Sequence, residues 1–479
     1  MRLGELLIAA KLVNQEQVDA ALAQNLINGR RLGENLIAAG AISQEALTAF
    51  MHRVPLEPGD LADTGIDEKW LLSLLLKLIY LGQLETPAQI VEAIKLPPHL
   101  VSDLIRMASE RRLLRALGSR DPRSGYGTSY ALNEEGLRWA QEALEQSQYA
   151  GPAPVSLEEF VALVQLQKIN HVVVTTEKIQ AAFGDLAISE AFIEKIGPAL
   201  NSDRAILMYG PPGNGKTSVA FCLANIFNDV IYVPHAVMIG GQIMRVYDPS
   251  LHQRLDLKQG AQAGAAPSLI RQEEIDARWV SCRRPFVVTG GELTLEMLDL
   301  SFAPTANLYE APLHVKALGG CFVIDDFGRQ LVPPTSLLNR WIVPMESRVD
   351  YLKLHTGKSF AIPFEELVIF STNLEPEDLM DPAYLRRIPY KLEVGAPSRE
   401  RFRQICDRAC AKEGLELTDE TFEAITRRIT EDKGMELAAY MAKFVVDQVV
   451  ATCRFLGKPP HFEPRFIAYA VDNLRVNRA

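Results

Sequence analysis

One short segment of the chain has residue types and spacing suited to binding phosphate. Gly210 to Thr217 matches the pattern G-x-x-x-x-G-K-[ST], follows an apolar run of strand length and opens a helix expected over residues 216–227. Backbone N–H groups and Lys216 would meet phosphate oxygens at the helix N-terminus, and the Thr217 hydroxyl would coordinate Mg²⁺. The predicted phosphate-binding residues are Gly210, Pro211, Pro212, Gly213, Asn214, Gly215, Lys216, Thr217 and Ser218.

A phosphate site of this kind also needs a carboxylate at the end of a neighbouring buried strand. The apolar run from Cys321 to Ile324 ends in Asp325 and Asp326. We expect Asp325 to hold Mg²⁺ together with Thr217, and Asp326 to polarise an attacking water molecule. The two motifs together predict hydrolysis of ATP.

In this combination of motifs the chain resembles the AAA+ ATPases, from about Ile179 to the C-terminus. That family usually has glutamate at the second carboxylate position, so Asp326 is a departure that predicts slow hydrolysis or, at the extreme, ATP binding alone. The strip ending at Asn373 resembles the sensor 1 strand, where the side chain meets the γ-phosphate or the water. The segment Asp381–Arg387 is similar to the one that carries the arginine finger. Taken singly, Asn373 could be a strand-end cap and the arginine pair a solvated loop.

This resemblance implies a ring, expected to be hexameric, that uses ATP and Mg²⁺ to remodel a protein substrate. The implied catalytic residues are Lys216, Asp325, Asp326, Asn373, Arg386 and Arg387. A hairpin expected over 349–363 resembles the insertion of clades such as the MoxR-like group. No arginine stands at the sensor 2 position in Gly434–Tyr440, and Lys443 is a poor substitute, so that role stays unfilled. Glycine pairs near residues 240 and 290 are read as plain turns in preference to substrate-gripping loops.

The order of apolar runs predicts the fold of the C-terminal part. Runs of strand length alternate with helical stretches, which implies a parallel sheet covered on both faces. The expected strands are Ala205–Tyr209, Val230–Val233, Phe286–Thr289, Cys321–Ile324 and Leu367–Ser371. After about Pro397 the pattern is wholly helical. The predicted class is an α/β P-loop AAA+ core with a helical lid.

The first 53 residues contain an internal repeat with an offset of 29 residues. Each copy predicts two short helices, with Asn14 and Ser43 as N-caps. The Arg-Leu-Gly motifs resemble the N-terminal domain of type II secretion and type IV pilus ATPases of the MshE kind, some of which bind cyclic di-GMP. That resemblance implies a ligand site at Arg2, Leu3, Gly4, Arg31, Leu32 and Gly33. Later positions of both copies depart from the family pattern, which leaves a purely protein-docking module as the alternative.

Residues between the repeat and the core follow the order of a winged helix. Helices are expected over 68–81, 87–94 and 99–117, then a turn-rich strip, a strand over 128–132 and a helix over 134–145. The segment from Thr128 resembles the second wing strand and final helix of bacterial winged-helix proteins. Arginines gather on the third helix and wing, which suits contact with DNA phosphates. A protein-binding or spacer role is an equal alternative.

Composition and length set the remaining limits. The 479 residues predict several domains, which we place at 1–54 (all-α repeat), 66–149 (winged helix), 160–396 (ATPase core) and 397–479 (lid). The net charge of −10 opposes non-specific nucleic-acid binding by the whole chain. Scattered cysteines and the lack of a long apolar stretch predict reduced thiols and a cytoplasmic protein without a membrane span. The alternative function is an ATP-dependent transcriptional regulator; substrate, pathway and operator cannot be read from the sequence.

Overall fold

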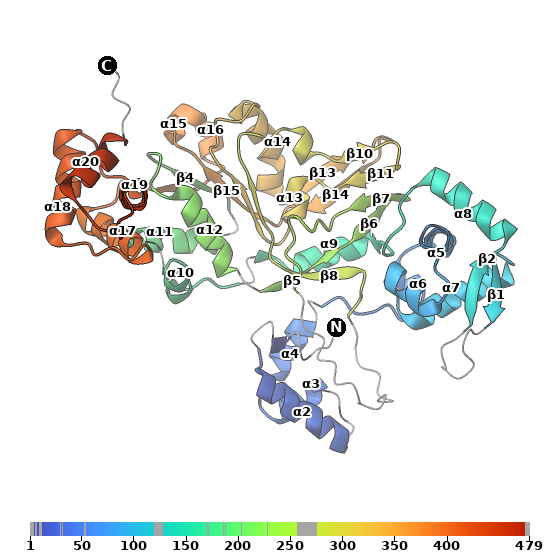
Figure 1. Ribbon diagram of the computed structural model, residues 1–479. Helices are drawn as coiled ribbons and strands as arrows, with labels where there is room; N and C mark the ends of the chain where they lie inside the picture. Colours follow the sequence, from blue (N-terminus) through green and yellow to red (C-terminus); the bar gives the residue numbers. More distant parts are fainter. Residues whose placement is uncertain are drawn as a thin grey trace.

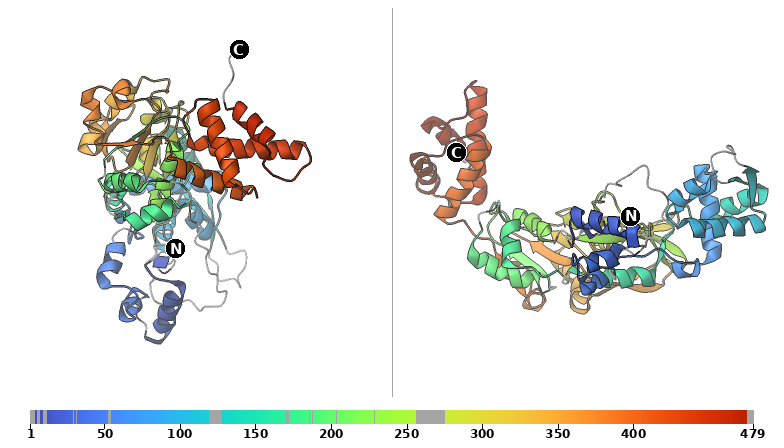
Figure 2. Two further views of the ribbon diagram at one scale, coloured as in Figure 1. Left: turned by 90° about the vertical axis from the view of Figure 1, so that its left-hand side faces the viewer. Right: turned by 90° about the horizontal axis from the view of Figure 1, so that it is seen from below.

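The structure is a computed structural model, which describes residues 4, 7, 8 and 12–474 except 29, 31, 52–53, 119–127, 170–171, 185, 187, 203, 228 and 256–274. Figure 1 shows the sheets near the middle of the molecule, with the N-terminal helices α2–α4 below them. Figure 2 shows the C-terminal helices as a separate cluster at one end and the helices of residues 62–149 at the other.

A five-stranded sheet forms the centre of the C-terminal part. Its strands are β4 (Ile206–Tyr209), β9 (Phe286–Thr289), β12 (Cys321–Ile324), β15 (Leu367–Ser371) and β16 (Tyr390–Glu393). They lie in the order β16-β4-β15-β12-β9 and all pairs are parallel. The carboxyl ends of β4, β12 and β15 therefore meet at one edge, so the three sequence motifs that follow these strands come together. β16 was missing from the expected strands.

Both faces of this sheet are buried, as the continuous apolar runs predict. Alternate residues of β12 enter two different cores, Cys321 and Val323 on one face and Phe322 and Ile324 on the other. Trp341 is fully buried against Phe322, with ring centroids 5.3 Å apart. The core with Cys321 is completed by helices α10 (Thr176–Ala182), α11 (Glu190–Leu200) and α12 (Lys216–Ile226). The core with Phe322 is completed by α13 (Leu313–Lys316), α14 (Pro334–Ser347) and α16 (Pro382–Leu385).

The hairpin expected over residues 349–363, before the strand that leads to Asn373, is present. β13 (Val349–Lys353) pairs antiparallel with β14 (Ser359–Pro363), and the chain turns between them. At the hairpin tip, the Phe302 and His355 rings are stacked with centroids 4.0 Å apart. Short helix α15 (Pro376–Leu379) follows β15. The hairpin thus packs on the second sheet rather than standing free.

A second sheet is built from four strands that lie between α12 and β12 in the chain and from β3, which precedes α12. It is five-stranded in the order β10-β11-β7-β6-β3. Its strands are β3 (Val155–Ser156), β6 (Ala236–Ile239), β7 (Gln242–Arg245), β10 (Ser301–Ala303) and β11 (Leu308–Glu310), with η3 (Glu296–Leu298) before β10. The expectation that Val230–Val233 joins the parallel sheet is wrong. β5 (Val230–Pro234) instead pairs antiparallel with β8 (Trp279–Arg283), a strand from later in the chain that forms the backbone hydrogen bonds of β5.

Residues 62–149 form three helices, a strand pair and a closing helix. These are α5 (Glu68–Gly82), α6 (Pro87–Ile94), α7 (Pro98–Glu110), β1 (Leu114–Gly118), β2 (Ser129–Leu132) and α8 (Glu134–Gln146), preceded by η1 (Ala62–Thr64). The helix expected over 99–117 is too long: Arg112 has φ 56°, α7 ends at Glu110, and the following residues pair with β2. The core of this part also includes Ala236, Ile243 and Leu308 of the second sheet.

The N-terminal repeat is helical where the structure describes it. Its elements are α2 (Gln15–Asn28), α3 (Leu32–Ala38) and α4 (Gln44–Met51). Both predicted N-caps are confirmed: Asn14 Oδ1 accepts from Gln17 N at 2.9 Å and Ser43 Oγ accepts from Ala46 N at 3.1 Å.

The C-terminal part is helical, as predicted. It consists of α17 (Arg399–Lys412), α18 (Asp419–Arg427), the π-helical turn η4 (Arg428–Asp432), α19 (Ala439–Phe455) and α20 (Pro464–Asp472). These helices enclose a core of their own around Phe402, Val445 and Phe466. All six cysteines of the chain are free, and five of them are buried.

A buried arginine joins three distant segments. The Arg278 side chain is 1% exposed and contacts the carboxylates of Asp276 and of Glu159 in α9 (Leu157–Leu166). Its guanidinium also donates to the carbonyl oxygens of Thr64 at 3.4 Å and Pro154 at 3.2 Å. The segments around Thr64 and Pro154, which flank the helices of residues 66–149, therefore both bond to the same buried side chain.

Candidate active site

The loop between β4 and α12 has the backbone of a phosphate cradle. Gly210, Gly213 and Gly215 have φ of 131°, 81° and 90°, values that other residues rarely adopt. A Cβ at Gly210 would lie 2.7 Å from the carbonyl oxygen of Val394, so that position also needs glycine for space. Pro211, Pro212 and Ser218 are exposed around the loop. The loop thus turns directly into the α12 N-terminus, where unpaired N–H groups favour an anion.

Lys216 is a buried cation whose two described hydrogen bonds go to neutral carbonyl groups. Its side-chain amine donates to the carbonyl oxygens of Gly210 at 2.8 Å and Pro211 at 3.0 Å. Burial lowers the pKa of Lys216, and the neighbouring carboxylates of Asp326 and Asp325 oppose that shift. A phosphate group would give this ammonium an ionic partner, so the residue fits a triphosphate ligand.

Thr217 and Asp325 come together from opposite parts of the sequence. The Thr217 hydroxyl donates to Asp325 Oδ2 at 2.8 Å. The backbone of Asp325 is fixed because its N–H donates to the carbonyl oxygen of Thr289 at 2.7 Å. A hydroxyl and a carboxylate side by side supply the oxygen ligands that Mg²⁺ prefers. The pair therefore fits the predicted metal position.

Asp326 and Asn373 also meet. Asn373 Nδ2 donates to Asp326 Oδ1 at 3.0 Å, which joins the ends of β12 and β15. Asp326 has φ 48°, in the left-handed region, and its side chain is exposed beside the cradle. The structure thus brings Lys216, Thr217, Asp325, Asp326 and Asn373 to one edge of the parallel sheet.

The two arginines of the predicted finger segment differ in their surroundings. Arg387 is half-buried and forms an ion pair with Glu346 of α14. Arg386 is exposed, and no ion pair or side-chain hydrogen bond is found for it within the described part of the chain. Among the described residues no arginine side chain bonds to the side chain of Asp325, Asp326 or Asn373.

Known proteins resemble part of this chain in sequence. The proteasome-activating nucleotidase of Archaeoglobus fulgidus is 24% identical over 307 residues, which is 59% of this chain and 73% of the relative. The protein of that name from Methanospirillum hungatei is 27% identical over 173 residues, which is 34% of this chain and 38% of the relative. These alignments, the strand order and the residues gathered at the sheet edge agree. The chain carries an AAA+ ATPase core. ATP and Mg²⁺ are the cofactors of this core.

Two further comparisons concern the fold and the lid. Among solved structures, the AAA domain of FIGL-1 has a TM-score of 0.34 and 15% identity, covering 62% of this chain and 84% of that one. A RuvB variant of Thermotoga maritima has a TM-score of 0.33 and 13% identity, covering 64% and 73%. A family described as a domain of unknown function, DUF8689, matches residues 398–473, which are the helices after the AAA+ core.

The lid contacts the phosphate cradle at a place that sequence reasoning missed. At the start of α19, Tyr440 N donates to the carbonyl oxygen of Gly213 at 2.9 Å and Ala439 N donates to Asn214 Oδ1 at 3.1 Å. A Cβ at Gly213 would lie 2.3 Å from the Tyr440 ring. Lys443 is exposed on the same helix. Tyr440 thus lies in the segment where a sensor 2 arginine would be expected. Because its contact with the cradle is uncharged, the sequence shows no charge pattern that would reveal it.

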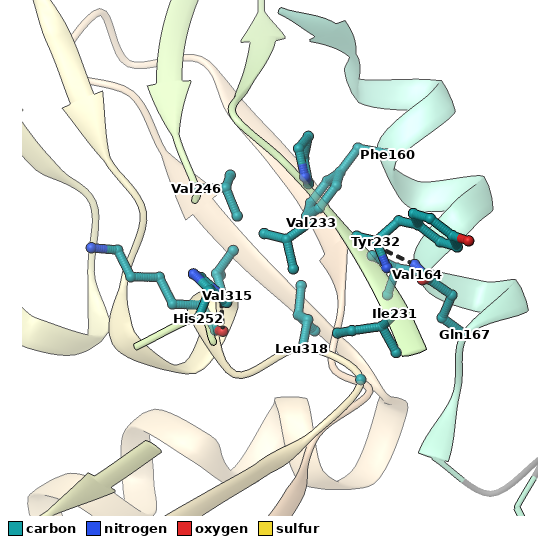
Figure 3. A pocket seen from close by; sticks show the side chains of 13 residues that line it. Phe160, Val164, Gln167, Ile231, Tyr232, Val233, Val246, His252, Val315 and Leu318 are labelled. Atoms are coloured by element: carbon teal, nitrogen blue, oxygen red, sulfur yellow. Dashed lines mark hydrogen bonds between the residues drawn. The ribbon is translucent and has the colours of Figure 1, made fainter. Parts of the chain in front are cut away.

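A small pocket elsewhere in the AAA+ core is separate from this site. It lies between α9 and β5, with Phe160 and Val164 facing Ile231 and Val233 (Figure 3). Its volume is about 20 Å³, near the size of one water molecule, and its lining includes none of the cradle residues. We regard it as a packing gap beside the inserted strands.

The predicted dinucleotide motif is only partly within the described residues. Arg2, Leu3 and Arg31 lie outside them. Gly4 and Gly33 are buried in helix contacts: a Cβ at Gly4 would lie 2.7 Å from Val18, and one at Gly33 would lie 2.7 Å from Leu47. Leu32 is half-buried beside the same core. The described part of the motif thus serves helix packing. No helix among the described residues has the length and apolar character needed to cross a bilayer.

Proposed function

We propose that this chain works as an oligomeric ring that hydrolyses ATP to remodel a protein complex. The observation that carries the proposal is the exposed Arg386, for which no side-chain partner is described, together with a site that no described arginine side chain contacts. A neighbouring subunit that inserts Arg386 would stabilise charge in the transition state, as arginine fingers do. Closed rings arise when each subunit offers one surface to the next, and six subunits are the number that the family resemblance implies.

The site residues take the roles expected of an AAA+ core. Lys216 neutralises phosphate charge, and Thr217 with Asp325 holds Mg²⁺, which when bound shields the phosphate oxygens. Asp326 polarises the attacking water, and Asn373 orients the Asp326 carboxylate through the bond at 3.0 Å. Since aspartate is shorter than glutamate, turnover is expected to be slow. A ring that binds ATP and hydrolyses it rarely would act as a switch instead of a motor.

A protein substrate is supported by the relatives. Two of them are named for activating a proteasome, an assembly that handles proteins. We propose the units 1–54, 66–149, 160–396 and 397–479 for repeat, winged helix, AAA+ core and lid. The inserted hairpin β13–β14 supports placement among clades of the MoxR-like type.

Subunit mixing tests the ring and its finger. Arg386→Ala and Lys216→Ala are each expected to abolish turnover alone. In a ring, random mixing restores about a quarter of the sites, because an Arg386→Ala subunit can receive the intact arginine of a Lys216→Ala neighbour. Arg387→Ala is the matched control, since its guanidinium already pairs with Glu346 within the chain. Mixtures that stay inactive would show that the arginine does not act between subunits.

The alternative function is a transcriptional regulator that reads DNA through residues 66–149. Two basic groups there already have partners within the chain: Arg106 pairs with Asp103 at 2.7 Å, and Arg111 lies over the Trp139 ring at 6.0 Å. These contacts favour a protein-binding role for this part. The discriminating measurement is duplex binding at rising salt; a DNA reader would weaken by orders of magnitude, and Arg106→Ala with Arg112→Ala would abolish binding.

We further propose that the N-terminal repeat regulates the motor by docking a partner. The buried Gly4 and Gly33 support this role, because their missing side chains let helices pack closely. Cyclic di-GMP is the alternative ligand, and the link to secretion, pilus or surface machinery stays a prediction from the family resemblance. Turnover measured with and without cyclic di-GMP, and again in Arg2→Ala/Arg31→Ala, decides between the ligand and the docking role.

A further inference from the structure

Gln330 lies just beyond the two site carboxylates and contacts three carbonyl groups. Its side-chain Nε2 donates to the carbonyl oxygens of Asp325 at 3.1 Å, Asp326 at 3.3 Å and Gly290 at 3.3 Å. Its Oε1 accepts from the backbone N–H of Gly328 at 2.8 Å. Every polar atom of this half-buried side chain is therefore used within the site region.

These contacts hold a tight turn in place. Asp326 has φ 48° and Gly328 has φ 102°, and the turn is closed by Arg329 N donating to the carbonyl oxygen of Asp326 at 2.9 Å. Aspartate visits the left-handed region more readily than most residues, but the conformation still costs free energy that surrounding contacts must offset. Gln330 supplies that restraint from the carbonyl side, while Asn373 bonds to the Asp326 carboxylate.

Gln330 also connects the turn to the end of β9. Gly290 starts the loop that follows β9, and its N–H donates to the Glu292 carboxylate at 2.8 Å. The backbone of Asp325 is bonded to Thr289 in the same strand at 2.7 Å. Because Gln330 bonds to all three carbonyl groups, a displacement of the loop at Gly290 would also move the backbone of Asp325 and Asp326.

We propose that Gln330 is a positioning residue for hydrolysis, which sets the orientation of Asp326 by fixing its turn against the end of β9. The inference rests on the proposed role of Asp326 in polarising water. Gln330 itself acts through that residue, since its amide is used in backbone contacts. Hydrolysis should therefore depend on Gln330, whereas ATP binding at Lys216 and Thr217 should not.

Glutamate is the sharpest substitution because it keeps the shape and removes the donors. In Gln330→Glu an ionised carboxylate would face the three carbonyl oxygens and disturb the turn.

The experiment compares steady-state ATP turnover of the full chain and its variants. Gln330→Glu and Gln330→Ala are expected to lower kcat about 10- to 100-fold, with KM for ATP and the Kd for a fluorescent ADP analogue within about threefold of the parent. Leu331→Ala, at a neighbouring side chain that is 85% exposed, is the matched control.

Asp326→Asn distinguishes the proposed role of Asp326 from the proposed role of Gln330. Turnover that survives Asp326→Asn would overturn the proposed role of Asp326 and, with it, the inference. If Asp326→Asn abolishes turnover while both Gln330 variants keep the parent kcat, the inference alone is wrong. A rise in the ADP Kd that matches the fall in kcat would show a general structural role for Gln330 and would also overturn it.

Discussion

Two lysines are buried in the described part of the chain, one in the AAA+ core and one in the helices of residues 62–149. Lys216 is 7% exposed and Lys77 is 3% exposed, and burial lowers the pKa of both. Lys216 faces Asp326 and Asp325, which oppose the shift, whereas Lys77 in α5 has the carbonyl oxygen of Ser147 at 3.0 Å and lies 5.8 Å from the centre of the Trp70 ring.

The difference shows which feature marks a site. Burial and a lowered pKa are common to both lysines, so neither feature alone identifies a functional residue. Lys216 also stands next to glycines with positive φ and to carboxylates from a second strand. A partner that is absent from the chain itself, in this case a phosphate, is implied only where several such groups converge on one open edge.

The largest expected effect is on hydrolysis. Lys216→Ala removes the charge that neutralises the phosphates, so ATP turnover should fall at least about 100-fold. Lys77→Met is the matched control at the other buried lysine and should leave turnover unchanged. Steady-state phosphate release by both variants checks the pair; equal losses would contradict the distinction between them.

A smaller effect is expected on stability, and it depends on pH. The pKa of Lys77 is lowered to about 8 in the folded chain from 10.5, so between these values the unfolded chain binds more protons. The free energy of unfolding of the helices of residues 62–149 should therefore increase by about 1–3 kcal/mol as the pH rises through this window.

Hydrogen exchange of α5 peptides, followed from neutral to alkaline pH, measures this dependence. Lys77→Met should flatten it relative to the parent, because methionine does not titrate. An unchanged difference between parent and variant across the window would show that Lys77 is not desolvated. Lys216→Ala serves as a control, since it lies outside these helices.

The smallest effect concerns Gly33 of the predicted dinucleotide motif. Gly33→Ala should destabilise the repeat by about 1 kcal/mol, because its Cβ would meet Leu47 at 2.7 Å and that flexible side chain must move. ATP turnover should be unaffected. Thermal unfolding and turnover check the two statements, and loss of a measured cyclic di-GMP affinity would instead make Gly33 part of a ligand site.

The AAA+ site was predictable from sequence because its chemistry is concentrated in short segments at strand ends. The cradle from Gly210 to Thr217 is contiguous, and parallel strands bring Asp325 and Asn373 to the same edge without further information. The N-caps Asn14 and Ser43 were predictable for the same reason, since a cap acts within one turn of helix.

The errors lie where distant contacts override a local pattern. Leu113 and Leu114 continue the apolar spacing of α7, yet Arg112 reverses the backbone and the pairing of β1 with β2 takes over. The strand β5 has the composition of a parallel strand but pairs with β8, which follows it by dozens of residues. Tyr440 contacts Gly213, which is far from it in sequence, through a backbone hydrogen bond. Gln330 acts through uncharged hydrogen bonds to backbone carbonyl groups. Neither kind of contact leaves a recognisable sequence motif.

The buried Arg278 bears on how the chain would respond to a protease. Composition marks residues 54–65 and 149–154 as linkers, and linkers are where proteolysis usually begins. Here the carbonyl groups of Thr64 and Pro154 are bonded to the Arg278 guanidinium, and Asp276 N donates to the carbonyl oxygen of Pro55 at 3.0 Å. Both stretches should resist cleavage in the intact chain. A fragment that starts after residue 156 would leave the guanidinium buried with two acceptors missing, so the AAA+ core is expected to be less stable when it is separated from the residues before it.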